Sequence, residues 1–167
     1  MSTNSEYNES TDIQSGTGEN QYLTFILNNE EYGVDILRVQ EIRGWEQSTK
    51  IPNAPDYVSG VINLRGMVIP IIDLRKRFNL PDCEVGSTTV IVIVKVVNDA
   101  DERTVGMTVD AVSEVYNVEA ESISETPELG STINTKFVKG LATVDEKMII
   151  LLDIDLLINV GVLQTEE

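Results

Sequence analysis

The chain has 167 residues, enough for one domain with a substantial hydrophobic core. Its 12 Lys and Arg residues against 28 Asp and Glu residues give a net charge of −16, which argues against nucleic acid and anionic membrane surfaces as partners. Because the chain contains no histidine, it can form no Ser-His-Asp or Cys-His nucleophile pair, no His-ligated zinc site and no phosphohistidine.

Neither a disulfide nor a targeting segment is predicted. Cys83 is the only cysteine, so no internal bridge can form. The N-terminus lacks the basic and apolar regions of a signal peptide, and the apolar runs are far shorter than the roughly 20 residues of a membrane span. We therefore expect a cytoplasmic protein without a metal site or a cofactor.

The N-terminal part of the chain predicts a tail followed by a hairpin. Residues 1–20 are rich in Ser, Thr, Asn, Glu and Gly and are expected to form a disordered acidic tail. Gln21–Leu27 and Glu30–Ile36 are typical of two strands joined by a turn at Asn28. Asp35–Ile42 is then expected to begin as a helical turn.

The stretch Gly60–Leu74 is the most informative in the chain. It predicts two strands around a tight turn at Leu64-Arg65-Gly66. Met67–Ile72 is an uninterrupted apolar run, which predicts a strand buried on both faces. Asp73 then supplies a side-chain oxygen that can cap a short helix over Leu74–Phe78.

The second half continues with strands and ends in a helix. Asn79–Ser87 is a polar connector, and Thr88–Val97 is the strongest strand because of its β-branched content. One or two further strands are expected in Thr104–Val118. A looser loop covers Ser122–Thr135, and a C-terminal helix is expected over Asp155–Leu163.

An internal repeat relates the two halves of the chain. Gly60 precedes Asp73 by the same number of positions as Gly140 precedes Asp153. An earlier block repeats as well, with equal spacings from its glycine: Gly33, Val39, Glu41 and Ile42 match Gly106, Val112, Glu114 and Val115. This pattern predicts a duplicated unit of about five short strands and therefore small barrels or sandwiches. The groove between two such units is the natural place for a ligand.

Arg65 is the main candidate for recognition. It lies in a turn between two strands, and a guanidinium suits a carboxylate or carbonyl of a partner. An ordinary solvated turn arginine is the alternative. The matching position in the second half is Asp145, so the repeated unit itself does not require a positive charge there. This asymmetry favours recognition.

A second candidate is the set of apolar residues that lie beside charged ones in the repeated block. Val39, Ile42 and Val115 can line facing walls of the groove, with Glu41 or Glu114 at its rim. A helical partner would dock there through its apolar face. For any one of these residues, a simple core position is the alternative.

The chain contains two long and specific motifs, EEYGVDILRVQEIRG over Glu30–Gly44 and VINLRGMVIPIIDLRKRF over Val61–Phe78. They resemble the CheW family of bacterial chemotaxis coupling proteins, and the resemblance extends over about Tyr22–Asn159. It implies a mainly β fold of two packed five-stranded SH3-like β-barrels with short helices. The domain would cover residues 21–163, with intertwined barrel subdomains over about 21–80 and 88–155.

The resemblance also implies a non-enzymatic adaptor with two protein partners. It would couple the cytoplasmic tips of chemoreceptors (methyl-accepting chemotaxis proteins) to the regulatory domain of the histidine kinase CheA in signalling arrays. It would be a monomer outside the array, recruited to membrane receptors without inserting into the membrane. The receptor-binding positions implied are Val39, Glu41, Ile42, Arg65, Val90, Gly106 and Val115. The kinase-binding positions implied are Ile123, Ser124, Glu128 and Leu129, with Ser124 standing where some relatives carry an arginine.

Two other functions stay open on the sequence alone. A CheW-like module can serve a different chemosensory pathway, for example twitching motility. An acidic hydrolase is a third hypothesis, because carboxylate pairs support hydrolysis without histidine, although no pair in this chain is persuasively placed.

Overall fold

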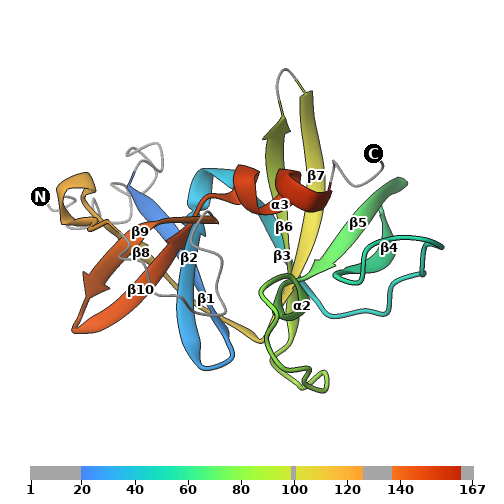
Figure 1. Cartoon of the computed structure of the whole chain (residues 1–167), viewed down its shortest axis with the longest axis horizontal. Helices are drawn as coiled ribbons and strands as arrows, with labels where there is room; N and C mark the ends of the chain where they lie inside the picture. The colour runs from blue at the N-terminus through green and yellow to red at the C-terminus, as the bar shows by residue number, and fades with distance from the viewer. Residues whose placement is uncertain (1–19, 99–100, 126–136, 163–167) are drawn as a thin grey trace, which may run out of the picture.

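The computed structural model describes residues 20–98, 101–125 and 137–162, and it shows a mainly β protein with two five-stranded sheets, as predicted (Figure 1). The predicted tail, apart from Asn20, lies outside the described residues. Sheet A has the order β8-β1-β2-β10-β9, and sheet B has the order β3-β6-β7-β5-β4. The strands of sheet A are β8 (Ala111–Asn117), β1 (Gln21–Leu27), β2 (Glu30–Asp35), β10 (Lys147–Leu152) and β9 (Val138–Val144). The strands of sheet B are β3 (Val39–Gly44), β6 (Val90–Asn98), β7 (Asp101–Val109), β5 (Met67–Asp73) and β4 (Val58–Leu64).

Each sheet combines strands from both halves of the chain. Sheet A takes β1 and β2 from the range 21–80 and β8, β9 and β10 from the range 88–155, whereas sheet B takes the remaining strands of both ranges. The strands β1 to β5 of the first half correspond in order to β6 to β10 of the second half. If each strand is replaced by its counterpart, the order of sheet A becomes the order of sheet B. The strand order therefore shows the same repeat as the sequence, with strands exchanged between its two copies.

The parallel strand pairs are where the two copies meet. Gly33 in β2 lies opposite Leu151 in β10, and Gly106 in β7 lies opposite Ile71 in β5. Both glycines are tightly packed: a Cβ atom would lie 3.0 Å from Cδ2 of Leu151 at the first position and 2.6 Å from Cδ1 of Ile71 at the second. A larger side chain at either position would push against the neighbouring parallel strand.

Each sheet is curled so that its two edges approach one another. No ladder joins the edge strands of either sheet within residues 20–98, 101–125 and 137–162. Instead, one isolated bridge links Thr49, after β3, to Val61 in β4, and another links Ser124, after β8, to Leu141 in β9. The backbone N···O distances of the bridges are 2.8 to 2.9 Å. Each sheet is thus an incompletely closed barrel.

Three hydrophobic cores hold this arrangement together. The largest lies between the two sheets and contains Phe25, Tyr32 and Phe78, whose rings pack in series with centroid separations of 5.9 and 5.6 Å. Each sheet also has a smaller core on its other face. The core of sheet A contains Tyr22, Tyr116, Val118, Ala142, Ile149 and Leu151. The core of sheet B contains Ile62, Leu64, Ile69, Ile71, Ile91 and Ile93.

In the described part of the chain, short helical segments follow four of the strands. The η1 turn (Ile36–Arg38) follows β2, and α2 (Leu74–Arg77) begins at the predicted cap, because the Asp73 side chain accepts hydrogen bonds from the backbone N–H groups of Arg75 and Lys76. The η2 turn (Ala120–Ser122) follows β8, and α3 (Ile154–Val162) follows β10. The helical turn predicted over Asp35–Ile42 is wrong beyond Arg38, because β3 begins at Val39 and pairs with β6.

The strand Met67–Ile72 is not buried on both faces as predicted. Met67 and Val68 are exposed by 56% and 65%, whereas Ile69, Ile71 and Ile72 are buried. The reason is the stagger of the sheet: β5 pairs with β7 only over its last three residues, so its beginning has β4 as its paired neighbour. Met148, at the beginning of β10, is equally exposed at the equivalent place.

Candidate functional site

The edge strand β3 carries three of the predicted receptor-binding residues on two faces. A bulge between Val39 and Glu41 shifts the pairing with β6, so that Val39 and Ile42 lie on the same face of sheet B. Val39 packs against the core between the sheets, whereas Ile42 on the same face is 44% exposed. Glu41 lies on the opposite face, toward the smaller core of sheet B.

The edge strand β8 repeats this arrangement in sheet A. A matching irregularity in its pairing with β1 places Val112 opposite Phe25 and Val115 opposite Leu23, so both valines share a face. Val112 packs against the core between the sheets, and Val115 is 44% exposed. Ile42 and Val115 are therefore two exposed apolar side chains at equivalent positions on the two edge strands.

Arg65 is joined to Glu41 by an ion pair between its Nη2 and Glu41 Oε1. Arg65 occupies the tight turn between β4 and β5 with a φ of 52°, whereas Glu41 lies on β3 at the other edge of the same sheet. The ion pair thus connects the two edges of sheet B. Arg65 remains 69% exposed, so its other guanidinium hydrogens are available to a partner.

The electrostatics of Glu41 follow from this contact. The hydrogen bond from Arg65 lowers the pKa of Glu41 below its usual value, with a smaller contribution in the same direction from Arg43. Arg43 Nη1 lies 3.5 Å from Glu41 Oε2, and its Nη2 lies 3.1 Å from Glu46 Oε2. Glu41 is therefore ionised at neutral pH and holds two arginines beside it.

A shallow pocket of about 340 Å³ lies beside this ion pair. Its walls are formed by Gln40, Glu41, Leu64, Arg65, Met67 and Thr104. Charged, polar and apolar groups thus line the same hollow. A second hollow of about 360 Å³ lies between the β3–β4 loop and the connector after α2, and none of the predicted receptor-binding residues lines it.

Arg43 and Met67 belong to this region and were missed by the sequence analysis. Arg43 lies two residues after Glu41 and therefore on the same face of β3. Its Nε atom is buried without a hydrogen-bond partner. Met67 was assigned to a buried strand because it starts an apolar run. The repeat held a signal for Arg43, because its equivalent in the second half is Tyr116 rather than another cation.

Val90 and Gly106 lie on β6 and β7, the next two strands after β3 in the order of sheet B, and Val90 is half-buried. Val90 pairs with Gly44 and packs against the core between the sheets. Gly106 is buried, and a Cβ atom there would lie 2.6 Å from Ile71 Cδ1 and 2.9 Å from Ile91 Cγ2. Gly106 can therefore affect β3 only through packing, whereas part of the Val90 side chain is exposed.

The predicted kinase-binding residues are placed only in part. Ile123 packs against the smaller core of sheet A, and Ser124 forms the backbone bridge to Leu141. Their packing is close, because a Cβ atom at Gly140 would lie 2.4 Å from Ile123 Cγ2. Glu128 and Leu129 lie outside the described residues.

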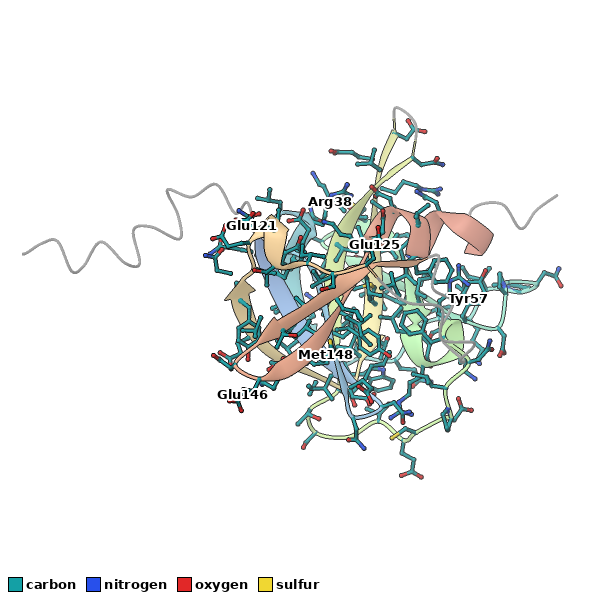
Figure 2. The ribbon with its side chains drawn as sticks, turned by 60° about the vertical axis from the view of Figure 1, so that its left-hand side comes forward. Arg38, Tyr57, Glu121, Glu125, Glu146 and Met148 are labelled. Carbon is teal, nitrogen blue, oxygen red and sulfur yellow. The ribbon has the colours of Figure 1, made fainter. Side chains whose placement is uncertain are left out.

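The equivalent end of sheet A is acidic where that of sheet B is basic. Asp145 occupies the position of Arg65 with the same φ of 52°, and Figure 2 shows Glu146 at the tip of the β9–β10 hairpin. The hydrogen bond from Lys147 to Tyr116 raises the pKa of Lys147, and the charge of the buried Glu31 carboxylate, 3.4 Å away, raises it further.

The described part of the chain offers no constellation for metal chemistry or membrane insertion. Within it, no group of three or more His, Cys, Asp or Glu residues is arranged to hold a metal ion. None of its helices is long and apolar enough to cross a bilayer.

Comparisons with known proteins agree with this architecture. A family model described as the CheW-like domain matches residues 21–161. The chain is 45% identical over 139 residues to the chemotaxis protein CheW of Klebsiella aerogenes, covering 83% of this chain and 81% of that protein. It is 37% identical over 142 residues to the probable chemotaxis protein CheW of Rhizobium etli, covering 85% and 89%.

A solved structure has the same fold. The crystal structure of the scaffolding protein TtCheW from Thermoanaerobacter tengcongensis superposes with a TM-score of 0.75 at 39% sequence identity. The superposition covers 83% of this chain and 91% of that structure. The two packed five-stranded sheets are thus shared over nearly the full length of that protein.

Proposed function

Because the chain belongs to the CheW family of chemotaxis proteins, which are scaffolds and not enzymes, we propose that it couples the cytoplasmic tips of chemoreceptors to the regulatory domain of the histidine kinase CheA. The observation that carries this proposal is the placement of Ile42 and Val115. Both are 44% exposed at matching positions on the two edge strands that border the core between the sheets. An amphipathic helical tip can cover both side chains at once.

The receptor contact combines this apolar pair with one polar anchor. Val39 and Val90 pack against the core between the sheets, on the face that carries Ile42. Arg65 is held by Glu41 on the other face of sheet B, where Gly106 packs against Ile71 and Ile91. An exposed arginine that is already oriented by one carboxylate loses less side-chain entropy when it binds a second acceptor. The receptor tip is therefore expected to present a carboxylate or a carbonyl to Arg65.

The kinase contact is proposed at the opposite end of sheet A. Ser124 forms the bridge to β9 there and Ile123 precedes it, and Glu128 and Leu129, which lie outside the described residues, come next in the sequence of the proposed contact. Because β8 and β9 lie at the opposite side of the molecule from β4 and β5 (Figure 1), both partners can bind one copy of the protein. Such simultaneous binding recruits the scaffold and the kinase to receptor arrays at the membrane.

The test separates the two contacts with a matched pair of charge reversals. Arg65→Glu places a carboxylate against Glu41 and removes the proposed anchor, so it is expected to weaken binding of a receptor cytoplasmic fragment by about tenfold or more. Asp145→Lys changes the equivalent turn and is expected to leave receptor binding unchanged. Calorimetric titration measures both, and equal receptor affinity of the two variants would contradict the proposed site.

The same variants test the second partner. Arg65→Glu is expected to bind the isolated CheA regulatory domain as the unchanged protein does. Ile123→Asp is expected to weaken that binding and to leave the receptor fragment bound. Loss of kinase binding in Arg65→Glu at full thermal stability would show that the two contacts are not separate.

A CheW-like module of another chemosensory pathway, such as one for twitching motility, would use the same surfaces. The identity of the receptor that copurifies with the protein from its own cells distinguishes the two. A chemotaxis receptor supports the first function, and a receptor of another pathway supports the second.

A further inference from the structure

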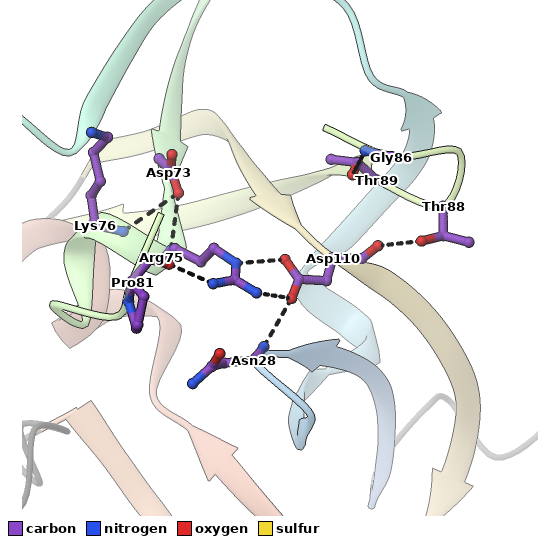
Figure 3. A network of polar contacts seen from close by, with 9 residues as sticks. All are labelled: Asn28, Asp73, Arg75, Lys76, Pro81, Gly86, Thr88, Thr89 and Asp110. Atoms are coloured by element: carbon purple, nitrogen blue, oxygen red, sulfur yellow. Dashed lines mark hydrogen bonds and ion pairs between the residues drawn. The ribbon is translucent and has the colours of Figure 1, made fainter. Parts of the chain in front are cut away.

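The two copies of the repeat are locked together by two ion pairs of opposite polarity. In one pair, Arg75 on α2 donates from Nε and Nη2 to the Asp110 carboxylate at 3.0 and 2.8 Å (Figure 3). In the other pair, Arg38 of η1 donates from Nη1 and Nη2 to the Asp155 carboxylate on α3, both at 2.7 Å. Both pairs are bidentate, which is the strongest geometry for such a contact.

These pairs occupy equivalent places in the fold. Arg75 and Asp155 are each the second residue of the helix after the last strand of a repeat. Arg38 lies in the short connection from β2 to β3, and Asp110 lies in the short connection from β7 to β8, so each stands where the chain passes from one sheet to the other. When the two repeats are aligned, Ala111 matches Arg38, so Asp110 stands one residue before the matching position. The residue on the helix is therefore the arginine in one pair and the aspartate in the other.

A further hydrogen bond confirms that the two sites correspond. The Asp110 carboxylate accepts from the backbone N–H of Asn28 at 2.9 Å, at the end of β1. The Asp155 carboxylate accepts from the backbone N–H of Val97 at 2.8 Å, near the end of β6, which is the equivalent strand. Each carboxylate thus accepts a backbone hydrogen bond at the end of the first strand of a repeat, Asp110 at β1 and Asp155 at β6.

Each ion pair joins one copy of the repeat to the other. Arg75 belongs to the first copy and Asp110 to the second, whereas Arg38 belongs to the first and Asp155 to the second. Pairing of a repeat with itself, as between the first halves of two chains, would bring Arg75 against Arg38. Pairing of the second halves would bring Asp155 against Asp110.

We propose that these four residues form a charge code that makes the first repeat exchange strands only with the second. The fold itself allows either partner, because both repeats supply the same strands in the same order. The side chains of the four residues are only 13 to 29% exposed, so like charges placed there would be poorly screened. The code acts against self-pairing of repeats and thereby against oligomers formed by strand exchange between chains.

The consequence extends to the receptor site. Exchange between unlike repeats is what brings β3 into sheet B beside β6 and β8 into sheet A beside β1. Ile42 and Val115 then border one shared core. The four charged residues are therefore positioning residues for both edge strands, although none of them lines the proposed receptor contact.

The test scrambles the code without changing composition. In the double variant Arg75→Asp with Asp155→Arg, both native pairs become like-charged and both self-pairings become complementary, while the net charge is unchanged. The quadruple variant adds Arg38→Asp and Asp110→Arg, which restores opposite charges in both native pairs with reversed polarity. The control exchanges two exposed charges elsewhere, Lys50→Glu with Glu119→Lys.

The expected results differ among the three full-length proteins. The double variant is expected to lower the equilibrium constant for folding by about tenfold or more and to form concentration-dependent oligomers in light scattering after size exclusion. The quadruple variant is expected to recover at least half of the loss in the logarithm of the equilibrium constant for folding. It is also expected to elute from size exclusion as the unchanged protein does. The control is expected to behave as the unchanged protein in both measurements.

Two outcomes would overturn the proposal. One is a double variant as stable and as monodisperse as the control. The other is a quadruple variant no better than the double, because the loss would then come from the helix start or the backbone hydrogen bonds rather than from pairing. Nuclear Overhauser contacts between Ile71 and Gly106, and between Gly33 and Leu151, report directly whether the native strand exchange is present in each variant.

Discussion

The β4–β5 turn and the β9–β10 turn have nearly the same backbone and opposite chemistry. Arg65 and Asp145 both have a φ of 52°, and the residues after them, Gly66 and Glu146, have φ values of 88° and 67°. The left-handed conformation is thus required by the hairpin in both places. The charge is not required, because one turn is basic and the other acidic. Because the two turns share a backbone conformation but not a charge, the charge of Arg65 is more readily explained by binding than by folding.

The partners of the two equivalent glutamates show the same contrast. Glu41 is paired with Arg65 across the open side of sheet B. Glu114, at the equivalent place, accepts a hydrogen bond from the Tyr116 hydroxyl at 3.2 Å on its own strand. Sheet B therefore has an ion pair between its edges that sheet A lacks among the described residues. The receptor is proposed to use this difference.

The largest expected effect concerns Gly60 and Gly140, two glycines at equivalent positions of the repeat whose surroundings differ. Gly60 has a φ of 149°, and a Cβ atom there would lie 2.2 Å from the Thr49 carbonyl oxygen. At Gly140 the nearest atom is the Ile123 side chain, which can shift, and the Ser124 carbonyl oxygen is 2.9 Å away. We expect Gly60→Ala to lower the free energy of unfolding by about 3 kcal/mol and Gly140→Ala by less. Urea unfolding measures both, and equal losses would contradict this ranking.

The two ion pairs between repeats give an intermediate effect that depends on pH. Burial alone would raise the pKa of Asp110 and of Asp155, but hydrogen bonds from Arg75 and Arg38 and from the backbone lower both below the ordinary value. A carboxylate whose pKa is lower in the folded state stabilises the fold when it is ionised. This stabilisation is present above about pH 4 and is lost as the pH falls through the folded-state value.

The measurement compares the two halves. Each pair is expected to contribute about 1 kcal/mol at pH 7, and the Arg75 pair more than the Arg38 pair, because the Arg75 side chain is 13% exposed and the Arg38 side chain 28%. Arg75→Gln is therefore expected to reduce the difference in unfolding free energy between pH 7 and pH 3 more than Arg38→Gln does. The reverse order would show that exposure does not decide the strength of these pairs.

Sequence patterns predicted the features that depend on neighbouring residues. The hairpin at Asn28, the cap at Asp73 and the repeat all rest on short spacings that the chain itself displays. The number of strands in each sheet followed from the repeat and from the family resemblance. Burial of Met67 was predicted wrongly, because the stagger between β5 and β7 is set by pairing between distant strands.

The exchange of strands could not be derived from periodicity. Equivalent strands of the two repeats have the same apolar pattern, so either copy fits either sheet. The Arg65–Glu41 pair was likewise hidden, since its members come from opposite edges of a curled sheet. The bulge that places Val39 and Ile42 on one face also leaves no clear mark in the sequence. Such features arise from tertiary contacts, which local patterns do not encode.

The smallest expected effect sharpens the contrast between the two turns without disturbing the fold. The Arg65 hydrogen bond is the main cause that lowers the pKa of Glu41, so Arg65→Gln is expected to raise that pKa toward its ordinary value. Arg43 remains beside the carboxylate and keeps part of the shift. Carboxyl chemical shifts followed through an NMR titration give the value, with Asp145→Asn as the matched control that leaves Glu41 unchanged. Because Glu41 and Arg65 meet at the surface, the free energy of unfolding is expected to stay close to that of the unchanged protein in either variant. A Glu41 pKa that does not respond to Arg65→Gln would mean that the two sheet edges do not meet in solution, and Arg65 would then reach a receptor from an unrestrained turn.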